Sequence, residues 1–392
     1  MSIALWALMV GCLAVLAWAY VGYPLAMLLR ARQFARPVRR AHWQPSVSVC
    51  IAVHNGAVHL DAKIDGLLAH DYPHDRLEIV VVSDGSTDGT AERLRDRAGP
   101  RVIGLECVVR RGKTASLADA IAAARGEVLV FTDVRQRLAP GSIQALCDAL
   151  ASGELRAASG LLKLESTDGY ARSVDAYWRY ETTLRRAEAA TGSVVGVTGA
   201  LYAVRAADMP VPPPGVVLDD VWVPMRIAAD GGRIGLVDEA VAFDRASPRA
   251  SVESARKRRT LAGNWQLLLR WPDFALPWRH PLAWRFIQHK LLRLVAPLLM
   301  LIAFVANLLL LHTGTPAQLL FAAQCAAYAA ALVGFAWPAT KRLLPIKLAA
   351  AFLEMNTYAL LGFVDFLLGR GGPLWQAAPL PLPPIPKTPP RP

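Results

Sequence analysis

The chain has 392 residues, a hydrophobic fraction of 54% and a formal net charge of +12 at pH 7. This length allows about two domains, and the hydrophobic fraction, concentrated at the two ends, is high for a soluble protein. The basic residues lie beside apolar segments without interleaved aromatic residues, so the charge favours lipid and phosphate over nucleic acid as partners. The five cysteines are scattered without CxxC or metal-ligand spacing, which indicates small buried side chains in a reducing compartment.

The N-terminal segment, residues 1–30, is predicted to cross a membrane. Ile3–Leu29 is apolar and uncharged, and ~20 such residues suffice for a span. A signal peptide is the competing interpretation, but no basic region precedes the run and no small-residue cleavage site is evident. Five arginines follow, at Arg30, Arg32, Arg36, Arg39 and Arg40. The positive-inside rule then puts the N-terminus outside and the following domain in the cytosol.

The central segment, residues 46–269, has ordinary globular composition and alternates strands with helices. Apolar runs such as Ile79–Val82 are typical of parallel strands buried on both faces. This alternation predicts an α/β fold with an open, mostly parallel sheet, which binds ligands at the carboxyl ends of its strands. The expected strands are 46–53, 77–83, 101–109, 127–132 and 157–164, and the expected helices are 57–68, 86–97, 113–124, 140–151 and 174–190.

The C-terminal segment, residues 280–369, is predicted to contain an interfacial helix and two to three spans. Leu282–Leu294 mixes aromatic, apolar and basic residues in the pattern of a helix that lies in the membrane interface. Val295–Leu311 and Ala317–Trp337 are expected spans, whereas Leu344–Leu368 contains Glu354, Asn356 and Asp365, which are costly in lipid. Three crossings would put the C-terminus outside, but Arg370, Lys387 and Arg391 favour the cytosol. An interfacial or re-entrant third segment would remove this conflict. The tail, residues 370–392, is proline-rich and predicted to be disordered.

Three acidic points form the best catalytic constellation in the sequence. Asp84 and Asp133 each follow a predicted strand, where a carboxylate can accept hydrogen bonds from a nucleotide or hold a divalent cation against a diphosphate. Asp219 and Asp220 follow a proline-rich loop, and one of them could act as a general base on an acceptor hydroxyl. Turn or helix-capping roles are the alternatives, and Asp88 is the expected cap of the helix from 86.

Two basic runs suit phosphate. Arg110–Lys113 combines a glycine turn, a helix N-terminus and positive charge, but its single glycine does not make a P-loop, and a solvated basic turn is the alternative. Arg256–Arg259 contains four cations, and Arg256 and Arg259 share one helix face. They could clamp a diphosphate leaving group, or form a juxtamembrane patch attracted to anionic lipid.

The order of these motifs resembles that of the membrane-bound family 2 glycosyltransferases of GT-A fold. These include the cellulose, chitin and hyaluronan synthases and bacterial exopolysaccharide transferases. The resemblance covers roughly 47–311, and its most specific segment is DYPHDRLEIVVVSDGSTDGT. VSVCIAVHN is similar to the family's opening strand, RRGKTASL to its G-G-K segment, and WRYE and VGVTGALYAVR to its acceptor-side helix and following loop. FTDVR stands in the place of the D-x-D motif, LDD of T-E-D and RKRRTLAGNWQ of Q-x-x-R-W.

The resemblance implies roles for the donor-side residues. Val53 and Asp84 would contact the uridine of the donor, and Lys113 would lie near the nucleotide. Asp133 would bind Mg²⁺ or Mn²⁺ and the diphosphate. The second aspartate of the D-x-D motif is Arg135 here, which removes one metal contact and bears on metal dependence.

The resemblance also implies roles on the acceptor side. Asp220 would deprotonate the acceptor hydroxyl with support from Asp219, and Arg259 would contact the pyrophosphate or a gating loop. The family's remaining motif positions differ here: they are occupied by Gly56, Leu218, Asp219, Arg256 and Thr260. The differences at Gly56 and in the Q-x-x-R-W segment argue against a processive channel of the cellulose synthase type.

The sequence therefore predicts an inverting glycosyltransferase with its GT-A domain on the cytosolic face of a multi-pass inner-membrane protein. Its partners would be a nucleotide-sugar, with a UDP-sugar as the expected donor, a polysaccharide or lipid-linked acceptor, the bilayer, and other subunits of a polysaccharide-export complex. Exopolysaccharide synthesis is the expected setting. Transfer of one sugar to a polyprenyl or other lipid acceptor is the first alternative. A catalytically inactive membrane subunit is the second, which Arg135 favours.

Overall fold

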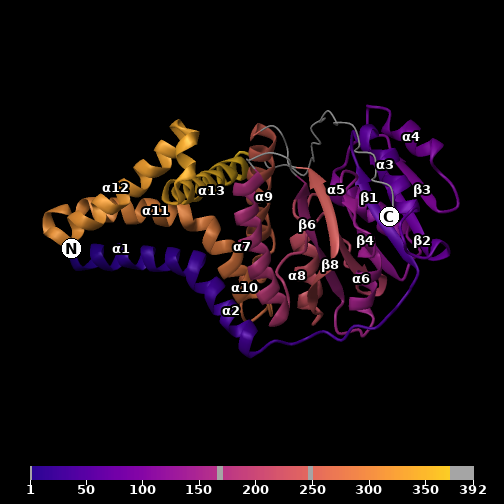
Figure 1. Ribbon diagram of the computed structural model, residues 1–392, viewed down its shortest axis with the longest axis horizontal. Coiled ribbons are helices and arrows are strands. Elements are labelled where there is room, and N and C mark those ends of the chain that lie inside the picture. The colour runs from indigo at the N-terminus through magenta and orange to yellow at the C-terminus, as the bar shows by residue number, and fades with distance from the viewer. Residues whose placement is uncertain (1, 166–170, 246–249, 371–392) are drawn as a thin grey trace.

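The computed structural model describes residues 2–165, 171–245 and 250–370, and its centre is one eight-stranded sheet (Figure 1). Four strands pair in parallel in the order β3-β2-β1-β4. They are β1 (Val47–Val53), β2 (Leu77–Asp84), β3 (Val102–Cys107) and β4 (Val128–Phe131). The predicted disordered tail lies almost entirely outside the described residues.

The sheet continues past β4 in mixed orientation. Strand β7 runs antiparallel to both β4 and β6, β6 pairs with β8 in parallel, and β5 closes the edge antiparallel to β8. These strands are β5 (Arg137–Leu138), β6 (Ala157–Glu165), β7 (Tyr202–Arg205) and β8 (Ile234–Arg245). This is the mostly parallel α/β sheet that the sequence predicted.

Helices cover both faces of the sheet because its central strands are apolar on both faces. Along β1 the buried side chains alternate, so that Val49 and Ile51 face one core while Cys50 and Ala52 face the other. The first core is closed by α3 (Ala57–Leu68), α4 (Thr90–Asp96) and α6 (Ser142–Leu150). The second is closed mainly by α5 (Lys113–Ala123) and α8 (Asp219–Ala229).

Most predicted element boundaries agree with the structure within a few residues, but the helix predicted from 86 begins at Thr90. Gly89 has a φ of 85°, which favours glycine and lets the chain turn into α4. Gly89, and not the predicted Asp88, is therefore the N-cap residue. The Asp88 carboxylate still accepts hydrogen bonds from the N–H groups of Thr90 and of Ala57, both at 3.1 Å. One aspartate thus holds the starts of two helices.

Within the described residues, four helical stretches are long and apolar enough to cross a membrane, and they include the segments predicted from sequence. The first joins α1 (Ser2–Ala17), a π-helical turn η1 (Trp18–Gly22) and α2 (Tyr23–Gln33). The second joins α10 (Ala283–Phe286), a π-helical turn η5 (Ile287–Leu291) and α11 (Leu292–Leu309). The others are α12 (Thr315–Ala336) and α13 (Leu344–Leu367). The predicted interfacial helix, 282–294, is therefore continuous with the span after it.

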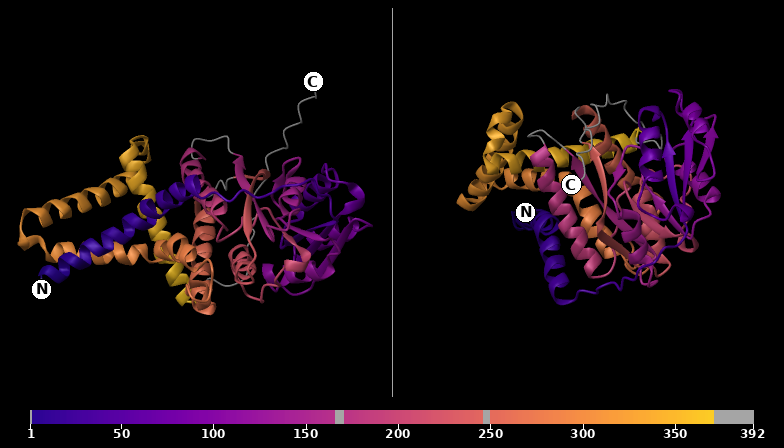
Figure 2. Two further views of the ribbon diagram at one scale, coloured as in Figure 1. Left: turned by 90° about the horizontal axis from the view of Figure 1, so that it is seen from below. Right: turned by 45° about the vertical axis from the view of Figure 1, so that its right-hand side comes forward.

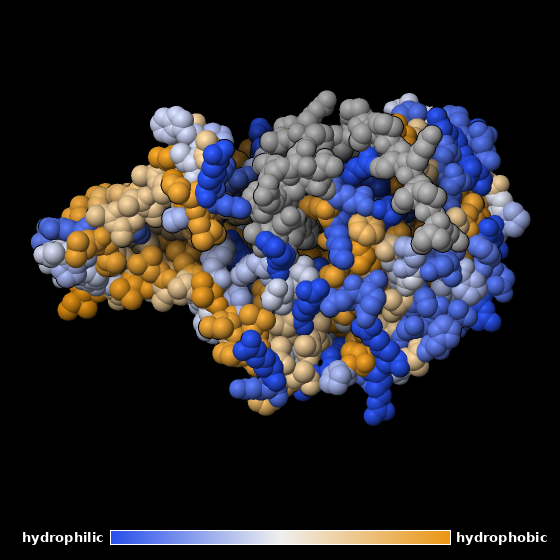
Figure 3. Space-filling model, in the orientation of Figure 1, coloured by the Kyte–Doolittle hydropathy of each residue, from blue (hydrophilic) through white to orange (hydrophobic). Residues whose placement is uncertain are grey.

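The apolar helices project from the α/β domain as an arm (Figure 1). Hydrophobic residues dominate the surface of this arm, whereas the domain surface is mainly hydrophilic (Figure 3). Two long helices, α7 (Ala171–Ala190) and α9 (Ala250–Arg270), stand between the sheet and the arm. Short 3-10 turns complete the chain: η2 (His74–Arg76), η3 (Ala206–Asp208), η4 (Pro272–Ala275), η6 (Leu311–Thr313) and η7 (Pro338–Arg342).

Candidate active site

The carboxyl end of β2 and the basic turn before α5 are held together by Asp84. Its buried carboxylate accepts hydrogen bonds from the backbone N–H groups of Arg111, at 2.7 Å, and Gly112, at 2.8 Å. Gly85 has a φ of 59°, and a Cβ there would lie 2.5 Å from the Arg110 nitrogen, so only glycine fits. Asp84 therefore fixes the loop that begins α5.

The end of β1 forms the neighbouring rim of the site. Val53 is fully buried in the sheet, and the next two residues turn outward. Asn55 has a φ of 52°, and its side-chain oxygen accepts a hydrogen bond from the Thr87 N–H at 2.8 Å. His54 Nδ1 lies 2.7 Å from the Asp84 carbonyl oxygen. The loops after β1 and β2 thus form one hydrogen-bonded edge at the ends of the parallel strands.

Lys113, the first residue of α5, lies among the three acidic residues downstream. Its Nζ is 3.0 Å from Asp133 Oδ1 and 3.8 Å from Asp219 Oδ2. Gly199 lies beside it, and a Cβ at Gly199 would be 3.7 Å from Lys113 Nζ and 3.6 Å from Asp220 Oδ2. Segments far apart in the sequence therefore meet around one ammonium group.

Electrostatics keep Asp133 ionised despite its burial. Burial by itself raises the pKa of this carboxyl, but Lys113, and then Arg135 and Lys63, lower it below its ordinary value. Burial opposes the charge of Lys113 too, but Asp133, Asp219 and Asp220 raise the pKa of its ammonium. The site therefore contains a carboxylate and an ammonium that are both charged at neutral pH.

The two adjacent aspartates occupy the first turn of α8, which agrees with the alternative of a favourable acidic pair at a helix N-terminus. Asp219 is 3% exposed, and its Oδ2 has no hydrogen bond to the residues that the structure describes. Burial, and then the neighbouring Asp219, raise the pKa of Asp220 to about 6, against the opposing effect of Lys113, Lys290 and Arg259. A carboxyl with a pKa near neutrality can accept a proton as a general base.

The position of the second D-x-D aspartate is part of an ion pair. The Arg135 guanidinium donates to Asp244 Oδ2 at 3.0 Å, and the Gln136 amide donates to the same oxygen at 3.0 Å. Among the described residues, no group of three His, Cys, Asp or Glu side chains is placed to hold a metal ion. Asp133 is thus the one predicted metal ligand, and the protein by itself does not form a complete cation site within the described part.

The basic run of α9 divides between structural ion pairs and the site. Arg256 pairs with Glu253 at 3.6 Å, Lys257 with Glu354 at 3.8 Å, and Arg258 with Asp365 at 2.7 Å. Arg259 has no ion pair within the described residues, and it lies near enough to Asp220 to lower the pKa of that carboxyl. The structure thus brings Arg259 toward the acidic cluster, while Arg256 is paired on its own helix.

Two side chains at the site were missed by the sequence analysis. Tyr202 on β7 stacks on Phe131 with ring centroids 4.6 Å apart, and its buried hydroxyl has no hydrogen-bond partner in the described chain. Lys63 on α3 donates to Thr132 Oγ1 at 2.9 Å and to the Gln136 carbonyl oxygen at 2.7 Å. Burial lowers the pKa of Lys63 to about 7. Lys63 lies beside Ile64 on the apolar face of α3. A lysine at such a position indicates a buried polar contact, so this residue could have been identified from the sequence.

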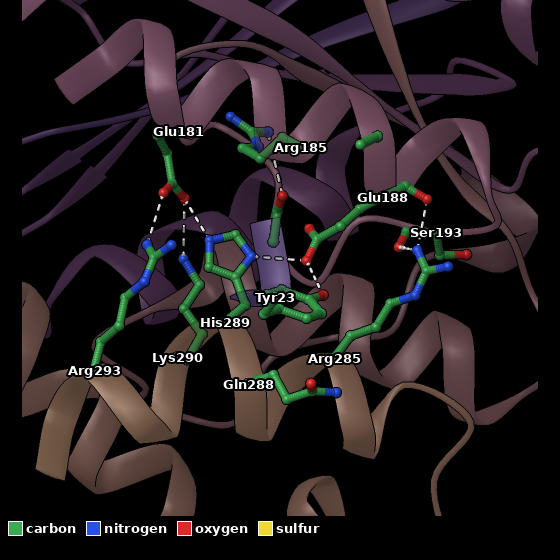
Figure 4. Close-up of polar contacts among 12 residues, drawn as sticks. Tyr23, Glu181, Arg185, Glu188, Ser193, Arg285, Gln288, His289, Lys290 and Arg293 are labelled. Atoms are coloured by element: carbon green, nitrogen blue, oxygen red, sulfur yellow. Dashed lines mark hydrogen bonds and ion pairs between the residues drawn. The ribbon is translucent and has the colours of Figure 1, made fainter. Parts of the chain in front are cut away.

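A buried polar network joins the domain to the arm and was also missed (Figure 4). His289 lies between two glutamates of α7, with Nε2 2.7 Å from Glu181 Oε1 and Nδ1 2.9 Å from Glu188 Oε1. The Tyr23 hydroxyl donates to Glu188 Oε1 at 2.6 Å. Lys290, which influences Asp220, lies 3.8 Å from Glu181 Oε1. The network thus links α2, α7 and η5 next to the acidic cluster.

Comparisons with known proteins support this fold. Residues 48–208 match the family model described as Glycosyl transferase family 2. The chain is 27% identical to an uncharacterised glycosyltransferase of Nostoc sp. over 132 residues, and this aligned stretch covers 33% of this chain and 39% of that protein. It is 29% identical over 111 residues to the undecaprenyl-phosphate 4-deoxy-4-formamido-L-arabinose transferase of Aeromonas hydrophila, covering 27% of this chain and 34% of that one. The chain thus matches less than half the length of these two curated relatives.

A solved structure shares the fold over almost the whole chain. It is the mannosyltransferase PcManGT from Pyrobaculum calidifontis in complex with GDP-Man and Mn²⁺, with a TM-score of 0.68 and 24% identity over 93% of this chain and 99% of that one. The α/β domain and its acidic edge therefore define a GT-A domain flanked by helices of membrane-spanning length and composition. The chain carries a domain of glycosyl transferase family 2.

Proposed function

We propose that the protein is a membrane-bound inverting glycosyltransferase that moves a sugar from a nucleotide-sugar to a polysaccharide or lipid-linked acceptor. The observation that carries the proposal is the position of Lys113, which lies 3.0 Å from Asp133 and 3.8 Å from Asp219. It places a phosphate-binding cation beside the carboxyl pair whose member Asp220 has a pKa of about 6. A base and a leaving-group cation side by side are what transfer to a hydroxyl requires.

In the proposed reaction, Asp220 accepts the proton of the acceptor hydroxyl. The hydroxyl oxygen forms a bond to the anomeric carbon on the face opposite the diphosphate, and the bond from that carbon to the diphosphate oxygen breaks with its electron pair. Inversion follows from this in-line geometry. Lys113 and Arg259 stabilise the negative charge that develops on the departing nucleoside diphosphate. Asp219 supports Asp220 from the preceding position of α8.

The donor nucleotide is assigned to the edge formed by the ends of β1 and β2. Val53 is fully buried, so it would support this edge from beneath and not contact the base itself. Asp84 would accept hydrogen bonds from the nucleoside in addition to those from Arg111 and Gly112. An ionised carboxylate has about four acceptor positions, so two backbone donors leave capacity for a ligand. Arg110, whose Nε and Nη2 have no partner in the described chain, adds a cation for the phosphates.

Mg²⁺ or Mn²⁺ is the proposed cofactor, with Asp133 as its protein ligand. A single carboxylate suits such an ion, because Mg²⁺ in nucleotide sites is usually held by one or two carboxylates, the substrate phosphates and water. Arg135 is engaged by Asp244 and does not compete directly for Asp133. When bound, the ion would neutralise charge on the diphosphate. The related mannosyltransferase structure contains Mn²⁺, which supports this assignment.

We place the catalytic unit at residues 46–269, on the cytosolic face of an inner membrane, because arginines follow the first span. Exopolysaccharide synthesis, with export-complex subunits as partners, is one setting. A polyprenyl phosphate is the second candidate acceptor, and the similarity to the Aeromonas undecaprenyl-phosphate transferase favours it. The arm offers few helices for a wide translocation channel, which also suits transfer of one sugar.

The test is nucleoside diphosphate release by the purified full chain in detergent, with a panel of UDP- and GDP-sugars and both metals. Asp220→Asn keeps the side-chain shape and removes the base, and should lower turnover by about 10²–10⁴-fold. Asp238→Asn, at an exposed aspartate paired with Arg186, is the matched control and should retain turnover.

Acceptor extracts and polyprenyl phosphate are added in parallel, and product length separates polymer synthesis from single transfer. Turnover that survives Asp220→Asn would overturn the assignment of the base. If no donor is turned over or bound, the enzyme proposal fails and a catalytically inactive membrane subunit takes its place.

A further inference from the structure

Helix α13 has the length and composition of a span, but both of its ends lie at the domain end of the arm (Figure 2). It begins just after α12, the helix that returns from the far end of the arm toward the domain (Figure 1). Gly334, near the end of α12, packs against α13, and a Cβ there would lie 3.0 Å from both Ala350 Cβ and Ile346 Cγ2. The first turns of α13 are therefore fixed at the domain side of the arm.

The last turns of α13 pack on α9, which belongs to the domain side as well. The Arg258 guanidinium donates to Asp365 Oδ2 at 2.7 Å, and Lys257 lies 3.8 Å from Glu354 Oε1. Gly362 brings the two helices into close contact, because a Cβ there would lie 3.1 Å from the Arg258 carbonyl oxygen. The acidic residues that are costly in lipid thus pair with two cations of the catalytic domain.

The orientation of α13 differs from that of the other long apolar helices. In the left view of Figure 2, α1, α11 and α12 run lengthwise along the arm, whereas α13 runs across them at the base of the arm. A helix that began at the domain end of α12 and crossed the bilayer would end at the tip of the arm, where α11 ends at Leu309. Instead, α13 ends beside Arg258 of α9, which pairs with Asp365. The direction of α13 is that of a helix in the membrane plane.

Much of the apolar surface of α13 remains exposed after these contacts. Four leucines are between 53% and 63% exposed: Leu344, Leu348, Leu360 and Leu367. The first two and the last two lie on different faces of the helix. A helix that pairs its acidic residues with the domain and leaves leucines exposed suits the boundary between headgroups and acyl chains.

We propose that α13 does not cross the membrane but lies in its interface on the domain side, with its leucines in lipid and its acidic residues on α9. The chain then crosses three times, through α1, α11 and α12, and Arg370 lies on the same side as the catalytic domain. This removes the conflict in the sequence, because Arg370, Lys387 and Arg391 no longer need to be translocated. The interfacial helix also fixes α9, whose Arg259 faces the acidic cluster.

The side of the membrane on which each segment lies is determined by labelling single cysteines with a membrane-impermeant maleimide, in intact cells and after lysis. In the full-length chain, Cys107 on β3 reports the domain side. His312→Cys reports the turn between α11 and α12, and Arg370→Cys reports the residue after α13. Each probe is the single cysteine of its chain, because the other natural cysteines, including the buried Cys12, Cys50 and Cys147, are changed to alanine. The inference requires position 370 to be labelled under the same condition as Cys107, and position 312 under the opposite one.

Labelling of position 370 together with position 312 would mean that α13 crosses, and would overturn the inference. This result is independent of catalysis, so it does not depend on the proposed glycosyl transfer. A second experiment tests the contact between α13 and α9 by reversal of charge. Arg258→Asp and Asp365→Arg should each lower the unfolding temperature in detergent, and the double variant should recover most of the loss. No recovery in the double variant would show that α13 does not dock through this pair.

Discussion

At the scale of single residues, the site depends on charged side chains that are only partly exposed to water. Lys113 lies within 4 Å of two carboxylates, and Asp220 belongs to an adjacent carboxyl pair. When two carboxylates are buried side by side, their repulsion raises the pKa of one of them, so that it can act as a base near neutral pH. The geometry assigns different chemistry to neighbouring aspartates: Asp133 stays ionised beside Lys113, whereas Asp220 can take up a proton.

The raised pKa of Asp220 gives a pH dependence with a definite sign. The base must be ionised, so turnover should fall by about tenfold per pH unit below the pKa of about 6 and level off above it. The measurement is kcat/KM for nucleoside diphosphate release between about pH 4.5 and 8. The residual turnover of Asp220→Asn should show no such inflection. A wild-type profile that is flat below pH 6 would contradict the role of Asp220.

At the scale of elements, a histidine between two glutamates joins the helical arm to the domain (Figure 4). Both glutamates of α7 stay ionised: burial raises their pKa values, but His289 and further donors lower them below the ordinary value. One glutamate oxygen lies within hydrogen-bond distance of each ring nitrogen of His289. The pairing fixes η5 on α7, and Tyr23 attaches α2 to the same carboxylate.

Removal of Glu188 should loosen this junction more than removal of a single hydrogen bond. Glu188→Ala removes the buried carboxylate that contacts His289 and Tyr23. It should lower the free energy of unfolding by ~3–5 kcal/mol, the range for breaking a buried ion pair. Tyr23→Phe removes one hydrogen bond to a charged group and should cost ~1.5–3 kcal/mol. The measurement is the unfolding temperature in detergent, with Glu239→Ala, at an exposed residue paired with Arg40, as control. Equal effects of Glu188→Ala and the control would exclude a structural role for the network.

At the scale of the whole molecule, two separate parts of the chain attach the domain to the arm. The N-terminal helix α2 binds α7 through Tyr23 and Glu188, and the C-terminal helix α13 binds α9 through Asp365 and Arg258. Arg185 of α7 and Arg259 of α9 are both close enough to Asp220 to interact with it electrostatically. The two helices therefore connect the apolar arm with the acidic edge of the domain.

Metal removal tests how much of the leaving-group charge the protein itself can stabilise. With Asp133 as the one protein ligand, the ion should be held mainly by the diphosphate, so EDTA should abolish turnover while the unfolding temperature without donor stays unchanged. Mn²⁺ or Mg²⁺ should restore turnover. Full turnover in EDTA would show instead that Lys113 and Arg259 are sufficient. A lower unfolding temperature of the donor-free protein in EDTA would show that the metal is structural.

The sequence by itself determined the local elements, because the signals that specify them are local. Apolar runs and their period identified β1, β2, α3 and α5 within a few residues, and apolar length identified the helices of the arm. The motif order also identified the acidic and basic residues that the structure brings to one edge, namely Asp84, Lys113, Asp133, Asp219, Asp220 and Arg259.

Only the tertiary structure decided the partners of the charges, because the members of those pairs are more than 90 residues apart. Arg135 pairs with Asp244, Lys257 with Glu354 and Arg258 with Asp365. These contacts separate Arg259, which turns toward the site, from the rest of its basic run. They also explain how acidic residues are accommodated in the apolar helix α13. Hydrophobic periodicity is readable along the chain, but whether a charge is paired depends on which surfaces the fold brings together.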